Sequence, residues 1–133
     1  MPHRLLHLIA MLAETIAVLR HVVLFAFKED ASAETVEAVV AGFAALPDAI
    51  SEINGYEWGT NVSPEGLNDG FTHCFTLTFA SAESRDAYLN HPAHVAFVKS
   101  LGQCLERSLV LDYWARLPAG PVEEQAVINA TVS

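Results

Sequence analysis

Four stretches of this chain have the apolar pattern of β-strands. The run HVVLFAF, residues 21–27, is rich in β-branched and aromatic side chains and predicts a strand. In FTHCFTLTF, residues 71–79, large apolar side chains and a histidine fill every second position, which predicts a strand with two distinct faces. Residues 50–62 and 108–115 predict two further strands, the first of them bent around an Asn-Gly pair.

Helical spacing separates these strands. Ser32 has the position of an N-cap, and the apolar residues after it recur at helical intervals up to Leu46. Pro47 is expected to end that helix. A short helix is predicted over 81–89 and a longer one over 92–107. The order of elements is therefore β-α-β-β-α-α-β.

This order predicts an α+β fold, a ferredoxin-like sandwich with a four-stranded antiparallel sheet. Helices can cover only one face of that sheet. The other face would expose Val22, Leu24, Cys74, the neighbouring threonines and one alternate set of side chains from the last strand. Because a second copy of the chain is the simplest cover, we expect a homodimer through this sheet face.

The two ends of the chain are predicted to lie outside the domain, which spans 19–116. Residues 1–18 are an N-terminal extension, and 117–133 are a C-terminal tail poor in large apolar groups. The first segment is apolar but interrupted by charge, and too short to span a membrane. Since no convincing cleavage site follows it, we expect an added helix, a loose extension or an upstream translation start, and not a signal peptide.

Composition and charge narrow the range of partners. Among 133 residues, 52% are hydrophobic, and the formal net charge is −9. The chain is thus expected to form a folded core and to bind neither nucleic acid nor an anionic membrane surface. Its two cysteines, Cys74 and Cys104, form no CxxC pair or zinc-finger spacing and are predicted to be buried, unreactive thiols. This usage fits a reducing cytoplasm, and no cofactor is predicted.

The stretch YLNHPAHVAF, residues 88–97, is the candidate for chemistry. His91 and Pro92 are suited to begin a helix, since proline fits the first helical position. His94 would then lie in the first turn, where the helix dipole favours a neutral imidazole that can act as a base. Tyr88 supplies a phenolic donor. The alternative is that these residues only start the helix and satisfy buried hydrogen bonds.

A metal site built from His91 and His94 is not predicted. Their spacing of three positions allows both to bind one ion, but no neighbouring carboxylate completes a set of ligands.

With these elements placed, the sequence resembles the stress-responsive A/B barrel (Dabb) family of dimeric α+β barrels. The similar segments are 21–28, 58–81, 88–97 and 109–113, and together they span about residues 19–115. The resemblance implies that two sheets face each other across a dimer to form an α/β barrel. The family includes plant stress-associated proteins, bacterial proteins of unknown role and a plant polyketide cyclase, so membership leaves the activity open.

Resemblance to the cyclase of this family implies roles for individual residues. By motif position, Tyr88 and His94 correspond to its catalytic pair for an intramolecular aldol condensation, and His21 and His73 to two further histidines. Strand alternation places both of these on the sheet face toward the helices, where an apolar pocket with a few polar groups would be typical of a small-molecule site. The predicted substrate-binding residues are His21, Val23, Phe25, Val39, Val40, Phe43, His73, Phe75 and His91.

Three interpretations therefore remain. The first is a cytoplasmic homodimeric Dabb protein with a hydrophobic pocket for a small apolar or aromatic ligand and no assigned cellular role. The second is a cofactor-independent cyclase or lyase that uses His94 as base and Tyr88 as donor. Val39, Val40 and Phe43 stand where the cyclase has an aromatic-rich wall, so its own substrate is not expected here. A monooxygenase of the related barrel type is a third interpretation without specific support.

Overall fold

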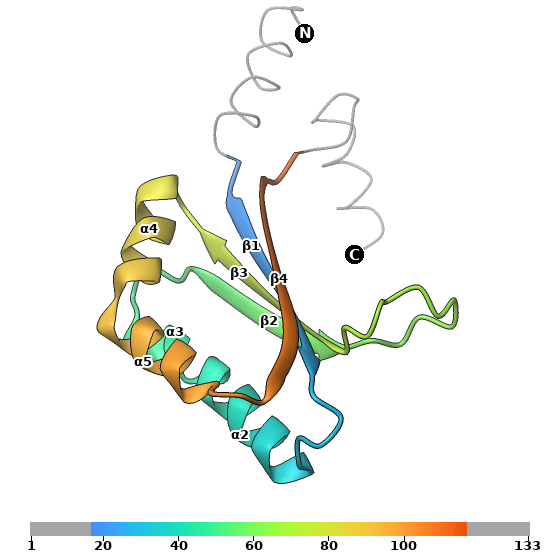
Figure 1. Cartoon of the computed structure of the whole chain (residues 1–133). Coiled ribbons are helices and arrows are strands. Elements are labelled where there is room, and N and C mark those ends of the chain that lie inside the picture. The colour runs from blue at the N-terminus through green and yellow to red at the C-terminus, as the bar shows by residue number, and fades with distance from the viewer. Residues whose placement is uncertain (1–16, 117–133) are drawn as a thin grey trace, which may run out of the picture. The chain divides into compact units, whose positions relative to one another are not determined.

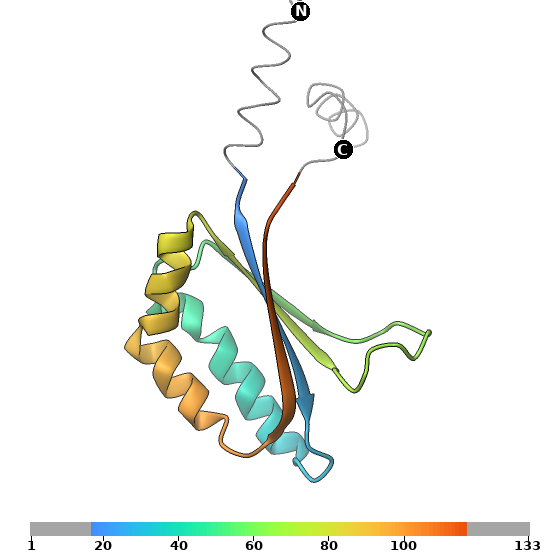
Figure 2. The same cartoon turned by 45° about the horizontal axis from the view of Figure 1, so that its top comes forward.

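The computed structural model describes residues 17–116. Apart from Ala17 and Val18, the predicted N-terminal extension and C-terminal tail lie outside the described residues. The elements are β1 (Leu19–Phe27), α2 (Ala33–Ala44), α3 (Leu46–Ala49), β2 (Gly55–Thr60), β3 (His73–Phe79), α4 (Ala82–Asn90), α5 (Pro92–Ser100) and β4 (Leu105–Trp114). Figure 1 shows helices α2 to α5 on one side of the sheet, and Figure 2 shows the same layering from a second direction.

The strands form one sheet in the order β2-β3-β1-β4. Strand β3 pairs antiparallel with both β1 and β2. Strand β4 also runs antiparallel to β1, as two contacts show. The backbone N–H of Lys28, just after β1, donates to the carbonyl of Cys104, just before β4, while His21 near the start of β1 contacts Asp112 near the end of β4. This four-stranded antiparallel sheet confirms the predicted ferredoxin-like α+β fold.

Strand alternation sorts the side chains onto two faces. On β1 and β3 the odd-numbered residues are turned toward the helices and are mostly buried, as at Val23 and Phe75, while Val22, Leu24 and Cys74 lie on the other face. The core lies between the sheet and the helices, and its centre is the stack of Phe43 on Phe75, with ring centroids 4.3 Å apart. The predicted assignment of faces is therefore confirmed.

Two helix boundaries differ from the prediction. Helix α2 ends at Ala44, and Pro47 lies in the first turn of the separate helix α3 instead of ending α2, since a first-turn residue needs no backbone N–H. Helix α5 ends at Ser100, and Gly102 takes a positive φ of 53° after it. As a result, residues 105–107 extend β4 rather than the helix.

The predicted strand over 50–62 is also shorter than expected, because β2 begins only at Gly55. Both cysteines are free and half-buried instead of fully buried. Cys104 lies between α5 and β4, where its thiol donates to the carbonyl of Leu101 at 2.9 Å. Within residues 17–116, no helix has the length and apolar character needed to cross a membrane.

Candidate functional site

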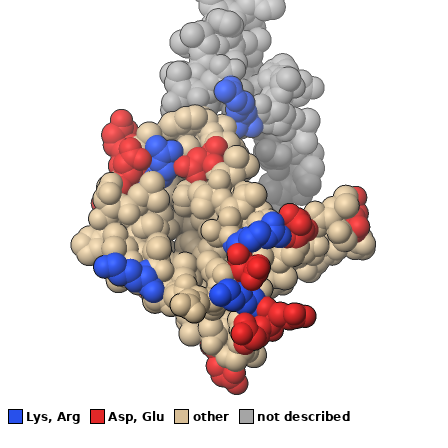
Figure 3. Space-filling model, viewed as in Figure 1, with Lys and Arg blue, Asp and Glu red and all other residues tan. Residues whose placement is uncertain are grey.

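A cavity of about 330 Å³ lies on the helix side of the sheet, where β1 and β4 face α2, α4 and α5. Seen from the side of β4, the surface is hollowed in a largely uncharged region between the helices and that strand (Figure 3). Apolar side chains form most of the wall: Val23, Phe25, Phe43, Leu89, Phe97, Val98, Leu101, Leu105 and Val110. The polar lining consists of His21, Tyr88, His94, Ser108 and Asp112. Such a composition is typical of small-molecule sites.

Residues 91–94, with the sequence HPAH, carry the chain from α4 into α5. His91 has an extended backbone, with φ −67° and ψ 137°, and its Nδ1 accepts a hydrogen bond from the backbone N–H of Ala93 at 3.0 Å. Pro92 follows at the first helical position, where its fixed φ suits the helix and its missing N–H costs nothing. His91 is therefore the N-cap of α5, and it does not line the cavity.

His94 lies in the first turn of α5 and lines the cavity. Its Nδ1 is 3.0 Å from the carbonyl oxygen of Leu89, and because a carbonyl can only accept, Nδ1 carries the hydrogen. The other ring nitrogen, Nε2, then holds the free electron pair in the neutral ring. Burial lowers the pKa of His94, the bond to Leu89 opposes this shift, and nearby His21 adds to the lowering. The imidazole is thus a neutral base near pH 7.

Tyr88 lies between the two histidines and is only 1% exposed. Its ring centroid is 4.5 Å from that of His94 and 5.6 Å from that of His21. The pKa of Tyr88 is raised, first by burial and then by the neighbouring Tyr56. The phenol therefore stays protonated and can donate a hydrogen bond into the cavity.

Asp112 and Arg85 were missed by the sequence prediction. The Nδ1 of His21 lies 2.6 Å from Oδ1 of Asp112, and Nη1 of Arg85 lies 3.0 Å from Oδ2 of the same carboxylate. Strands β1 and β4 and helix α4 are thereby joined at the polar end of the cavity. One hint of this site was present in the sequence, because Asp112 is the single carboxylate in the apolar run 109–114 of β4. Its partner His21 could not be inferred, since that contact depends on how β4 pairs with β1.

The structure brings only some of the predicted pocket residues together. His21, Val23, Phe25, Phe43, Tyr88 and His94 line the cavity. Val39 and Phe75 are buried in the core, and Val40 packs against it. His73 pairs with Phe25 in the sheet and lies beside Trp58 and Phe27, with centroids 6.2 and 5.1 Å away. Among residues 17–116, no group of three or more potential ligands could hold a metal ion.

The molecule is an α+β protein of ferredoxin-like fold. It has an apolar cavity between sheet and helices, with His21, Tyr88 and His94 at one end. The chain belongs to the stress-responsive A/B barrel domain (Dabb) family, whose model matches residues 19–115.

Two relatives from plants match most of the domain. The chain is 40% identical over 94 residues to the stress-response A/B barrel domain-containing protein HS1 of Arabidopsis thaliana, covering 71% of this chain and 86% of the relative. It is 29% identical over 97 residues to olivetolic acid cyclase of Cannabis sativa, covering 73% of this chain and 96% of the cyclase.

Solved structures show the same fold. Hydroxynitrile lyase from Passiflora edulis superposes with a TM-score of 0.73 at 26% identity, over 79% of this chain and 99% of the lyase. A dimeric protein of unknown function with a ferredoxin-like fold from Bacteroides fragilis superposes with a TM-score of 0.61 at 29% identity, over 74% and 96% of the two chains.

Proposed function

We propose that this chain is a homodimeric Dabb protein that binds a small, mainly apolar or aromatic molecule in the cavity between its sheet and helices. One observation carries this proposal: the cavity has apolar walls and gathers His21, Tyr88, His94 and Asp112 at one end. That end can satisfy the polar group of a ligand whose body rests on the apolar walls. The free cysteines are consistent with a cytoplasmic location, which is part of the same proposal.

The uncovered sheet face supports the proposed homodimer. Leu24 and the exposed residues Leu109, Leu111 and Tyr113 supply an apolar surface there, on β1 and β4. A second cavity of about 510 Å³ opens on the same face beside Leu24, Cys74 and Leu109. An apolar patch of this kind on a sheet marks an interaction surface, and a similar fold from Bacteroides fragilis is dimeric.

Filling the cavity tests the proposed binding site. Val110 lines the cavity but is 56% exposed, so Val110→Trp adds an indole without overpacking the core. Affinity for 4-butylphenol, measured by isothermal titration calorimetry, should fall by at least about tenfold. Val95→Trp is the matched control, because Val95 is exposed on α5 and does not line the cavity. Unchanged affinity in the Val110→Trp protein would remove the cavity as the binding site.

The geometry of His94 supports a second candidate, intramolecular aldol chemistry of the type performed by cyclases. Nε2 of His94 removes a proton from the carbon next to a ligand carbonyl, and the electron pair moves onto the carbonyl oxygen. The Tyr88 hydroxyl stabilises this enolate by donating a hydrogen bond. The enolate carbon then bonds to a second carbonyl carbon of the same molecule, and that oxygen takes the proton back from His94.

His94→Gln tests the second candidate with a fluorogenic β-hydroxyketone, whose cleavage is the reverse of an aldol closure. Turnover should fall by about 10²–10⁴-fold, the usual contribution of a general base. In the wild-type protein the rate should fall at a lower pH than an ordinary histidine would give, because the pKa of His94 lies below its ordinary value and the base must be unprotonated. Equal rates in the wild-type and His94→Gln proteins would eliminate this chemistry.

A further inference from the structure

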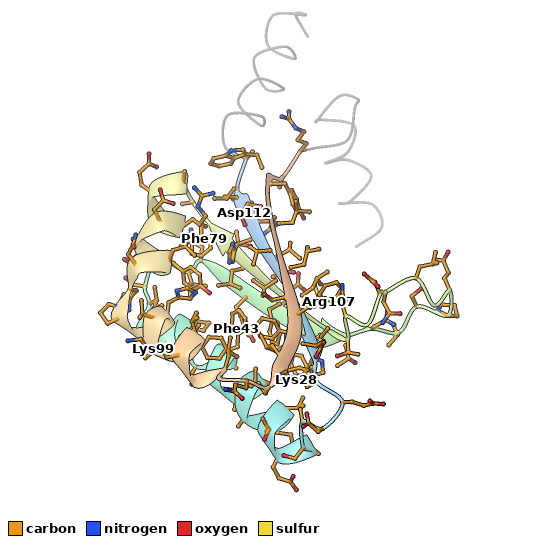
Figure 4. The ribbon with its side chains drawn as sticks, viewed as in Figure 1. Lys28, Phe43, Phe79, Lys99, Arg107 and Asp112 are labelled. Carbon is orange, nitrogen blue, oxygen red and sulfur yellow. The ribbon has the colours of Figure 1, made fainter. Side chains whose placement is uncertain are left out.

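The charges around the cavity are unevenly placed. Among residues 17–116, no lysine or arginine lines it, and Asp112 is the only acidic lining residue. Figure 4 shows Lys99 on α5, and Lys28 and Arg107 toward the end of the sheet away from Asp112. Among the described residues, Arg85 is the cation that forms an ion pair with a cavity side chain.

Arg85 and Asp112 balance each other at the polar end of the cavity. Oδ2 of Asp112 is 3.0 Å from Nη1 of Arg85, and both side chains are about one-quarter exposed, each at 25%. Oδ1 of Asp112 is occupied by Nδ1 of His21. Both carboxylate oxygens therefore have partners inside the protein. Nε of Arg85 also lies 3.1 Å from Oδ1 of Asp86, but the Asp86 side chain is 58% exposed, so water screens its charge and Arg85 remains the cation that balances Asp112.

We propose that the cavity selects ligands with an uncharged hydrogen-bonding head group, such as a phenol or ketone, and that Arg85 sets this preference by balancing Asp112. The inference rests on the ligand cavity proposed above. A carboxylate head would approach Asp112 with no lining cation to pair with, and burying an unpaired charge is costly. An ammonium head would find a carboxylate whose oxygens are already engaged. An uncharged head can instead use the hydrogen-bonding groups of Tyr88, His94 and Ser108.

Three probes with one alkylphenyl body and different heads test the preference: 4-butylphenol, 4-butylbenzoate and 4-butylbenzylamine. Calorimetric titration of the full-length protein at pH 7 should give the phenol an affinity at least about tenfold higher than that of either charged probe. Benzoate binding as tightly as the phenol would overturn the inference.

Two substitutions should shift the preference in opposite directions. Arg85→Met leaves Asp112 unbalanced, so the benzylamine should gain at least about tenfold relative to the phenol. Asp112→Asn leaves Arg85 without its partner at the cavity and paired only with the exposed Asp86, so the benzoate should gain, while the amide oxygen can still accept from His21. Lys99→Met, which removes a cation from exposed α5 surface, is the matched control and should leave all three ratios unchanged.

Folding of each variant is checked by far-ultraviolet circular dichroism. If the Arg85→Met protein does not fold, the role of Arg85 is tested by the Asp112→Asn protein alone, from the ratio of its affinities for 4-butylbenzoate and 4-butylphenol. Ratios that stay at the wild-type values in every folded variant of this pair would overturn the role of Arg85. Absence of binding by all three probes to the wild-type protein would instead contradict the proposed ligand cavity itself, and the inference would fall with it.

Discussion

Replacing Leu24 by aspartate is expected to convert the proposed dimer into a monomer. Leu24 lies in the middle of β1 on the sheet face that the helices leave uncovered. A twofold interface uses the same patch of both copies, so each dimer would bury two carboxylates without partners. Because burying an unpaired charge costs several kcal/mol, the dissociation constant should rise by at least about 100-fold. Sedimentation velocity at micromolar concentration measures the change.

Val62→Asp is the matched control for this prediction. Val62 is also an aliphatic residue, but it is 91% exposed just after β2. The same new charge should therefore leave the dimer intact. A Leu24→Asp protein that sediments as a dimer would show that the uncovered sheet face is not the interface, and the copies would then have to meet elsewhere.

The strands and their faces could be predicted from sequence because alternation acts locally. Each side chain of β3 is turned to one face or the other by the pleat alone, and the buried residues Phe75, Leu77 and Phe79 follow this rule. Helix ends were less predictable. Pro47 fits either the end of one helix or the first turn of the next, and the choice made in the structure, to begin α3, is not decided by the local pattern.

The candidate site could be predicted only in part, because it combines one local motif with distant strands. Tyr88 and His94 are six positions apart, and their contact follows from the short α4–His91–α5 junction, which the proline already indicated. The pairing of His21 with Asp112 joins residues 91 positions apart. It requires the register of β4 on β1, and a shift of one residue would turn Asp112 to the other face.

His73, in contrast, was predicted to line the same pocket as His21 but does not line that cavity. It shares a sheet face with His21, so alternation alone predicts one pocket for both. The register instead pairs His73 with Phe25, four positions along β1 from His21, where His73 lies beside Phe27 and Trp58 and lines the second cavity. Sharing a face is therefore not enough to share a site.

Removing the ring of Phe75 should give the largest loss of stability. Phe75 is fully buried, lies on β3 under α2, stacks on Phe43 and lies 5.3 Å from the ring of Phe25. Phe75→Ala should lower the free energy of unfolding by about 3–5 kcal/mol. The transfer free energy of the ring is lost, and side chains held in place by the sheet cannot move in to fill the space that the ring leaves. Urea unfolding at one fixed protein concentration measures this, since the proposed dimerisation would make stability depend on concentration. Val62→Ala should change stability by less than about 0.5 kcal/mol. A loss below about 1.5 kcal/mol for Phe75→Ala would mean that the aromatic stack is not the centre of the core, because only a partly exposed ring is lost so cheaply.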